Sequence, residues 1–116
     1  MTSQINGYGA LLPTPFDLEV RSLDDRTVLL VYGELDMATA TRVSDAIDEM
    51  VHAGLVGDVV VDVTALTFCD VRGLAALLGA HQTIRRAGGR LTVSGASVMV
   101  RRLLDLSRLD SVMELN

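Results

Sequence analysis

The chain has 116 residues, of which 49% are hydrophobic and 3% aromatic, and its formal net charge is −5. This length predicts one domain with a single core that needs neither disulfides nor a structural metal. The negative charge argues against a nucleic-acid-binding protein, which needs a basic face, and the absence of Trp argues against an aromatic stacking platform.

The first fifteen residues show no periodicity and contain two glycines and two prolines, so a flexible N-terminal segment is expected over residues 1–15. They carry no positively charged region followed by a long apolar run, and no apolar run in the chain approaches the ~20 residues that cross a bilayer. The single cysteine is compatible with a reducing compartment. A soluble, cytoplasmic protein without membrane insertion is therefore expected.

The first half of the chain predicts a hairpin, a helix and a buried strand. Residues 16–22 alternate loosely and residues 27–35 (TVLLVYGEL) form a more apolar run, which together favour an antiparallel hairpin with the second strand the more buried one. Residues 38–53 change to a helical period, and Gly54 marks the end of that helix. The β-branched residues of 59–63 are typical of a central strand covered on both faces.

The second half continues the alternation of helices and strands. The helix after CDVRG places Leu74, Leu77, Leu78, His81 and Ile84 on one face and ends at 88–89, and residues 91–93 form a short strand. A third helix is expected after a capping serine at position 97, and a last strand over 112–115. The order β-β-α-β-α-β-α-β predicts an α/β fold with a mainly parallel sheet of four to five strands and an N-terminal hairpin.

Two polar loops follow predicted strands, at residues 33–36 and 64–73, where sites of open α/β sheets gather. Asp70 stands directly before a helix, so the first interpretation is an N-cap, and Asp36 has the same interpretation for the preceding helix. A metal or acid–base pair ranks lower, because no third ligand has suitable spacing and both histidines, His52 and His81, fall on helices.

No catalytic arrangement is evident. Cys69 has no histidine near it in sequence, and neither G-x-G-x-x-G nor G-x-x-x-x-G-K-[ST] occurs. The sequence therefore predicts a protein that is not an enzyme and that needs no metal or cofactor.

Three stretches together resemble the STAS domain: GELD at 33–36, DVTALTFCDVRGLAALLGAH at 62–81 and LLDLSRLDSVMEL at 103–115. They resemble more narrowly the bacterial anti-sigma factor antagonists, which implies a STAS-like fold over residues 16–116. In that family the central stretch usually reads D-x-S-x-L-x-F-x-D-S-S-G-L. The resemblance implies that the serine after the second Asp is phosphorylated by a partner kinase that is also the anti-sigma factor, and that phosphorylation breaks the complex.

The resemblance carries over residue by residue, with one departure. Val71 stands where the phosphorylated serine would be, and Arg72 where the second serine would be. Because Val71 has no hydroxyl, it cannot be phosphorylated. The partner-binding residues implied by the family motif are Asp36, Asp70, Val71, Arg72, Gly73 and Leu74.

Two interpretations of the departure stay open. Val71 and Arg72 either form a contact patch committed to one state, or they reflect drift after the switch was lost. Arg72 opposes the helix macrodipole by about 0.3–1 kcal/mol unless it pairs with Asp36, Asp70 or a carboxylate of a partner. Thr64 and Thr39 are candidate substitute phosphosites, with Thr67 the least favoured threonine because it continues toward the sheet.

Cys69 occupies a position where the family often has Met, which favours a buried apolar residue over a redox-sensing thiol. The function expected from the resemblance is a protein–protein interaction module that binds an anti-sigma factor of the ATP-binding serine kinase type. The alternatives are a STAS subunit of a membrane transport system and a sensor domain for a small ligand or nucleotide. The cognate partner and the oligomeric state are not set by the sequence.

Overall fold

The computed structural model describes residues 16–107 and 114–115. The predicted N-terminal segment, residues 1–15, and the first half of the predicted last strand lie outside the described residues. Among the described helices, none is long and apolar enough to span a bilayer. The elements are β1 Asp17–Ser22, β2 Thr27–Leu35, α1 Ala40–His52, β3 Asp58–Asp62, β4 Leu66–Cys69, α2 Val71–Arg86, β5 Arg90–Ser94, α3 Val98–Leu106 and β6 Glu114–Leu115.

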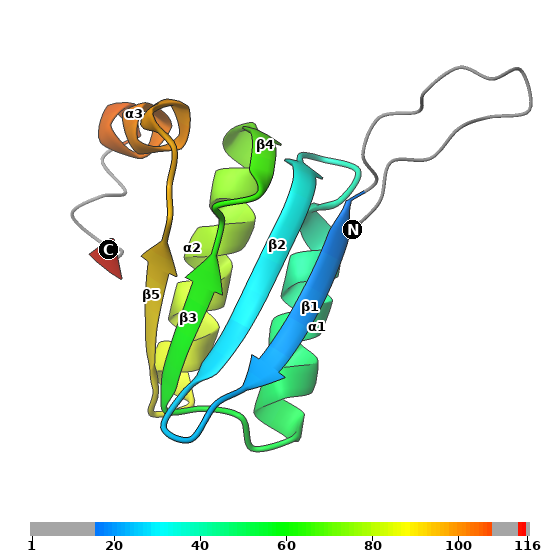
Figure 1. Cartoon of the computed structure of the whole chain (residues 1–116), viewed down its shortest axis with the longest axis vertical. Coiled ribbons are helices and arrows are strands. Elements are labelled where there is room, and N and C mark those ends of the chain that lie inside the picture. Colours follow the sequence, from blue (N-terminus) through cyan, green and yellow to red (C-terminus); the bar gives the residue numbers. More distant parts are fainter. Residues whose placement is uncertain (1–15, 108–113, 116) are drawn as a thin grey trace, which may run out of the picture.

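The strands form a sheet in the order β1-β2-β3-β5-β6. Strands β1 and β2 pair antiparallel, whereas the β2–β3, β3–β5 and β5–β6 pairs are parallel. Helices α1 and α2 lie side by side against one face of the sheet, and α3 lies beyond the end of β5 (Figure 1). The predicted α/β fold, with a mainly parallel sheet and an N-terminal hairpin, is confirmed.

Strand β4 was not predicted, because the sequence analysis assigned its residues to the loop 64–73. The first part of β2 pairs with β3, and its end, from Gly33 to Leu35, pairs with β4. The register of this second pairing shifts between Gly33 and Glu34. Strand β4 therefore takes the place of β3 beside the end of β2. This exchange carries the chain to the start of α2 directly beside the end of β2.

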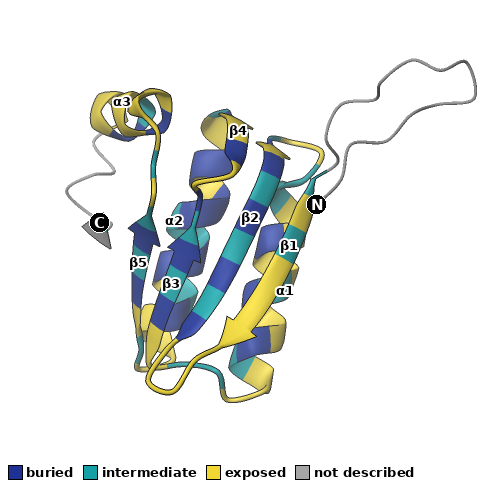
Figure 2. Ribbon diagram, viewed as in Figure 1, coloured by how far each residue is buried: buried dark blue, intermediate teal, exposed yellow. Residues whose placement is uncertain are grey.

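The core lies between the sheet and the two long helices. Burial alternates along β2 (Figure 2). Leu29, Val31, Gly33 and Leu35 are buried, whereas Leu30, Tyr32 and Glu34, the residues that alternate with them, are more exposed. The predicted stripe of α1 is buried at Val43, Ile47 and Met50. Such alternation is what a sheet with one covered face requires.

The prediction that the Val-rich strand is covered on both faces is wrong. In β3, Val59 and Val61 are buried but Val60 and Asp62 are only half-buried. Helices α1 and α2 share one face of the sheet, so the β-branched residues on the other face keep part of their surface exposed (Figure 2).

The predicted helix ends are confirmed. Gly54 and Gly88 follow α1 and α2 with φ of +75° and +89°, which glycine adopts without steric cost. Ser97 caps α3, since its Oγ accepts a hydrogen bond from the Val100 N–H at 3.2 Å.

On the side of the hairpin, the Arg42 guanidinium donates to the Phe16 carbonyl oxygen at 3.0 Å and stacks over the Phe16 ring. Helix α1 thereby fixes the residue that leads into β1.

Helix α2 approaches the sheet closely at Gly73, in its first turn. A Cβ atom added there would collide with the Leu35 carbonyl oxygen and would lie 2.9 Å from Cys69 Sγ. A backbone carbonyl cannot move aside as a flexible side chain can. Glycine at position 73 therefore sets the distance between α2 and the end of β2.

We expect Gly73→Ala to destabilise the protein by about 1–3 kcal/mol, the usual cost of overpacking. Gly79→Ala is the matched control in the same helix, because a Cβ there meets nothing within 4 Å and a helix-interior alanine gains up to about 1 kcal/mol over glycine. Urea unfolding followed by circular dichroism measures both changes. Equal shifts of the two midpoints, or a Gly73→Ala midpoint at or above that of the wild type, would contradict the close packing at Gly73.

Candidate functional site

The ends of the two polar loops predicted from the sequence, residues 33–36 and 64–73, lie side by side and form one corner of the molecule. In the parallel pairing of β2 with β4, Leu35 is opposite Cys69, and the Asp70 N–H donates to the Leu35 carbonyl oxygen at 3.2 Å. The turn after Leu35 and the start of α2 are thus joined through the backbone at the carboxyl ends of two strands. This juxtaposition is where the fold class places binding sites.

Asp70 is the N-cap of α2. Its Oδ1 accepts a hydrogen bond from the Gly73 N–H at 2.9 Å, and its backbone is extended, as an N-cap requires. The structural interpretation of this carboxylate is confirmed. Because Asp70 Oδ1 is engaged by the helix backbone, the main role of Asp70 is to fix where and in which direction α2 begins.

Asp36 organises its own turn rather than capping α1. Its Oδ1 accepts from the Ala38 N–H at 2.9 Å, and its backbone N–H donates to Thr39 Oγ1 at 3.0 Å. The Thr39 hydroxyl in turn donates to the Glu34 carbonyl oxygen at 2.8 Å. The N-cap of α1 is Thr39, whose side chain makes no cap hydrogen bond, so the prediction that Asp36 caps this helix is wrong.

The first turn of α2 divides into an outer and an inner pair of residues. Val71 is 70% exposed and Arg72 is also exposed, whereas Gly73 is buried and Leu74 is 1% exposed. The prediction that Leu74 contacts a partner is corrected, because its side chain belongs to the core. Gly73 contributes close packing against Leu35 and offers no side chain for contact.

Arg72 does not form the pair with Asp36 or Asp70 that the sequence left open. Over residues 16–107 and 114–115, ion pairs join Arg21 to Glu19 and Arg26 to Asp25, whereas Arg72 forms none. Its positive charge therefore stands at the amino end of a helix without an intramolecular counter-charge among the described residues. That position is unfavourable for the isolated chain.

An apolar groove that was not predicted from the sequence adjoins this corner. It has a volume of about 570 Å³ and lies between β4, the first turn of α2 and α3. We call it the α2–α3 groove; its exposed lining residues are Phe68, Val71, Val98, Met99, Arg102 and Leu106. No local signal in the sequence links the two helices, because their placement around one hollow depends on the position of β5 in the sheet.

The candidate substitute phosphosites differ in availability. The Thr39 hydroxyl is held in the hydrogen bonds of the Asp36 turn, so a phosphate there would disrupt that turn. Thr64 is exposed in the turn between β3 and β4, with its side chain close to Gly95 of the loop before α3. Thr67 lies in β4, in agreement with the expectation that it continues toward the sheet.

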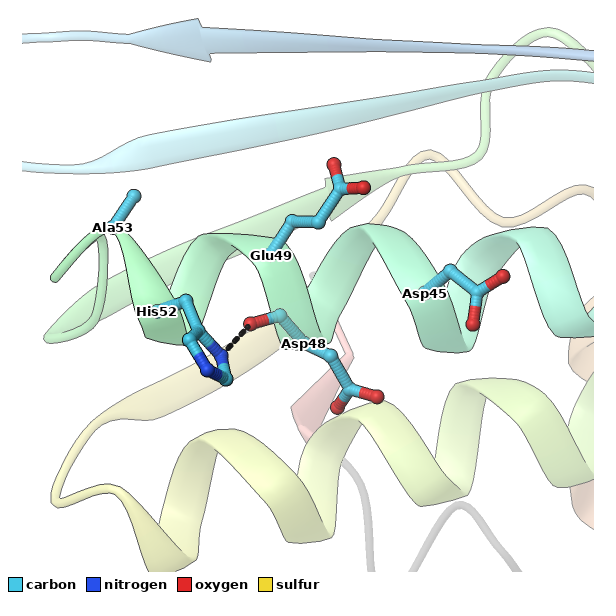
Figure 3. A pocket seen from close by; sticks show the side chains of 5 residues that line it. All are labelled: Asp45, Asp48, Glu49, His52 and Ala53. Atoms are coloured by element: carbon cyan, nitrogen blue, oxygen red, sulfur yellow. Dashed lines mark hydrogen bonds between the residues drawn. The ribbon is translucent and has the colours of Figure 1, made fainter.

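A second hollow lies on the outer side of α1 and does not form a convergent site. It is lined by Asp45, Asp48, Glu49, His52 and Ala53. The carboxylates point in different directions, and His52 Nδ1 lies 3.2 Å from the Asp48 carbonyl oxygen of its own helix (Figure 3). Among the described residues, no group of three metal-ligating side chains is close enough to hold an ion.

Two further side chains singled out by the sequence lie in the interior. His81 is buried on α2, as its helical face indicates, and its Nδ1 is buried without a hydrogen-bond partner. Cys69 is 2% exposed, which confirms the interpretation as a buried apolar residue. Burial, followed by the nearby Asp70 carboxylate, raises the pKa of the Cys69 thiol from 9.0 to about 11.

The comparisons with known proteins agree with this geometry. Residues 18–115 match the family model described as "Mlab, STAS domain". The chain belongs to the STAS domain family. The Paenibacillus polymyxa protein named anti-sigma F factor antagonist is 33% identical over 99 residues, which cover 84% of this chain and 85% of that protein.

Two solved structures illustrate the range of the fold. An anti-sigma factor antagonist from Mycobacterium paratuberculosis superposes with a TM-score of 0.78 at 28% identity and covers 90% of this chain and 89% of that one. A sulfate transporter family protein from Wolinella succinogenes has a TM-score of 0.66 at 16% identity and covers 74% of this chain and 69% of that one. The second likeness shows the shared STAS fold alone.

The burial of Cys69 predicts low reactivity of its thiol. A thiol with a pKa of about 11 rather than 9.0 holds roughly one hundredth as much thiolate at pH 8, and only the thiolate attacks an alkylating agent. We expect iodoacetamide to modify the folded protein at least about 100-fold more slowly than the urea-unfolded protein at pH 8. The rate should rise about tenfold per pH unit up to pH 10, since the thiolate fraction does so below the pKa.

Mass spectrometry of quenched samples measures both rates in the same chain, so the unfolded protein is the control. Rapid modification of the folded protein at pH 8 would contradict the buried thiol and revive the redox interpretation of Cys69.

Proposed function

We propose that this protein is an anti-sigma factor antagonist that binds an anti-sigma factor of the ATP-binding serine kinase type. The binding surface is the corner formed by the Asp36 turn and the first turn of α2. The observation that carries the proposal is the 70% exposure of Val71 at the position where the family motif has its phosphorylated serine. An apolar side chain held out at this position is suited to contact with a protein surface.

The names of the relatives support the proposed partner class. The Paenibacillus polymyxa relative and the Mycobacterium paratuberculosis structure are both named as antagonists of anti-sigma factors, and each aligns over more than four fifths of this chain. The likeness to the sulfate transporter family protein is one of fold, and no contact in the described residues favours a transport role. The antagonist is therefore the function put forward.

Binding at this corner differs from the family switch in one respect. A phosphate on the first residue of α2 would add roughly −1.5 to −2 charges beside Asp36 and Asp70. Val71 has no oxygen to accept a phosphoryl group, so this position stays apolar and uncharged. The proposed antagonist is thus permanently in the binding state at position 71, and the exposed Thr64, in the turn between β3 and β4, stays a candidate for modification.

The contact needs no rearrangement of the fold. A stable interface requires about 800 Å² from each partner, and the first turn of α2 is fixed by the Asp70 cap and by Gly73 against Leu35. A surface held in this way loses little conformational entropy on binding.

We expect Val71→Asp to weaken binding of the anti-sigma kinase by about 30-fold or more, because burying an unpaired carboxylate costs ~2 kcal/mol or more. The kinase is first identified by pull-down from the source organism and then purified, and affinity is measured by isothermal titration calorimetry. Val20→Asp on β1 is the matched control, since Val20 is an exposed valine away from the corner. Equal affinities of wild type and Val71→Asp would contradict the proposed surface.

A second variant tests the lost switch. Val71→Ser restores the hydroxyl, so with ATP we expect the anti-sigma kinase to phosphorylate this variant at position 71. Wild-type protein under the same conditions should gain no phosphate there, and mass spectrometry locates any that appears. If neither wild type nor Val71→Ser binds any anti-sigma kinase of the organism, the proposed function is wrong.

A further inference from the structure

The α2–α3 groove extends the exposed apolar surface well beyond the position of the family phosphosite. Val98 and Leu106, at opposite ends of α3, are 75% and 78% exposed, and Met99 on α3 and Phe68 on β4 are also exposed in the lining. The inner face of α3 is buried at Val100 and Leu104, as in an ordinary amphipathic helix. A small domain rarely gathers exposed large apolar side chains from a strand and two helices around one hollow unless another surface covers them.

The rim of this groove carries positive charge in a protein whose net charge is −5. Arg102 lines the groove from α3, and Arg72 is exposed on the first turn of α2 next to Val71. Neither arginine forms an ion pair within the part of the chain that the structure describes. The groove therefore combines an apolar lining with one unpaired cation, Arg102, and a second cation, Arg72, follows the lining residue Val71. The Asp70 carboxylate also lines the groove, where one of its oxygens is engaged by the Gly73 N–H.

We propose that the α2–α3 groove receives an amphipathic helix of the partner, whose apolar stripe is flanked by acidic residues. This inference rests on the proposed function and adds the chemistry of the partner's docking element and the participation of α3. The apolar stripe would cover Val71, Val98 and Leu106, and the acidic residues would face Arg72 and Arg102. Docking of a helix into an apolar groove is a common mode of peptide recognition, and charges at the rim mainly set the rate of association and the choice of partner.

Other occupants fit the same surface less well. A small ligand is usually enclosed on most sides, whereas Val71, Val98 and Leu106 each expose at least 70% of their surface. Residues 1–15 contain no Asp or Glu and cannot neutralise the two arginines. A second copy offers the acidic outer side of α1, but the apolar stripe of that helix is already buried.

The test uses the full-length protein and the purified anti-sigma kinase. We expect Val98→Asp to weaken binding about 30-fold, because it would bury a carboxylate in the groove, and Arg102→Glu to weaken it about tenfold with a smaller salt dependence of the association rate. Arg86→Glu is the matched control, because Arg86 is an exposed arginine at the opposite end of α2. Thermal unfolding confirms that each variant is folded.

A photo-crosslinking residue placed at position 98 identifies the partner segment. The expected product joins this position to a helix of the kinase that carries Asp or Glu beside its apolar stripe, and replacing those acids by Arg should restore binding to Arg102→Glu. If Val71→Asp releases the kinase while Val98→Asp and Arg102→Glu bind like wild type, the groove inference is overturned and the proposed function stands. If wild type binds no anti-sigma kinase, the proposed function itself fails.

Two other results would also overturn the inference. One is a dimer of the free protein, measured by light scattering, that Val98→Asp dissociates, since a second copy would then occupy the groove. The other is a variant lacking residues 1–15 that binds an apolar fluorescent probe in the groove more strongly than the full chain, since the chain's own N-terminal segment would then cover it.

Discussion

The corner depends on one backbone carbonyl, that of Leu35. It accepts the hydrogen bond from the Asp70 N–H, and the same oxygen occupies the space that a Cβ at Gly73 would need. The first turn of α2 is therefore pressed against the end of β2, with Gly73 and Leu74 on the inner side. Since successive residues of a helix are rotated by about 100°, Val71 and Arg72 are directed outward by the contact that buries their neighbours.

The features predicted correctly from the sequence are those that depend on a local pattern. The hairpin, the apolar stripe of α1 and the caps at Asp70 and Ser97 follow from side-chain periodicity and from hydrogen bonds within a few residues. Strand β4 has only four residues, which is too short for a period to be recognised, and it is a strand because β2 offers a free edge there. Its existence is a tertiary effect that no local pattern records.

Leu74 shows how two kinds of sequence evidence conflict. The family motif included it in the contact surface, whereas the helical period grouped it with Leu77 and Ile84 on the apolar face. The period was right, because the phase of α2 against the sheet is set by burial of that whole face. Residue type misled the prediction for residues 59–63. β-branched residues suit either face of a strand and do not indicate whether one face or both faces are covered.

The participation of α3 lay beyond sequence reasoning for a different reason. Val98 and Leu106 are ordinary exposed residues of an amphipathic helix when α3 is considered alone. They become part of one surface with Val71 because β4 leads into α2 and β5 leads into α3 at the same end of the sheet, where these strands finish. Spatial convergence of this kind follows from strand order, which periodicity does not encode.

This convergence also bears on whether Val71 and Arg72 reflect drift after loss of a phospho-switch. Drift at position 71 alone predicts no matching residues on α3. Yet α3 also presents exposed apolar side chains and a cation, Arg102, on the other side of the groove from Val71 and Arg72. Arg72 is unfavourable at a helix start for the isolated chain, so its placement is better explained by a carboxylate of a partner. Because Val71 cannot carry a phosphate, control of binding in the proposed function is not expected to come from a charge added at position 71.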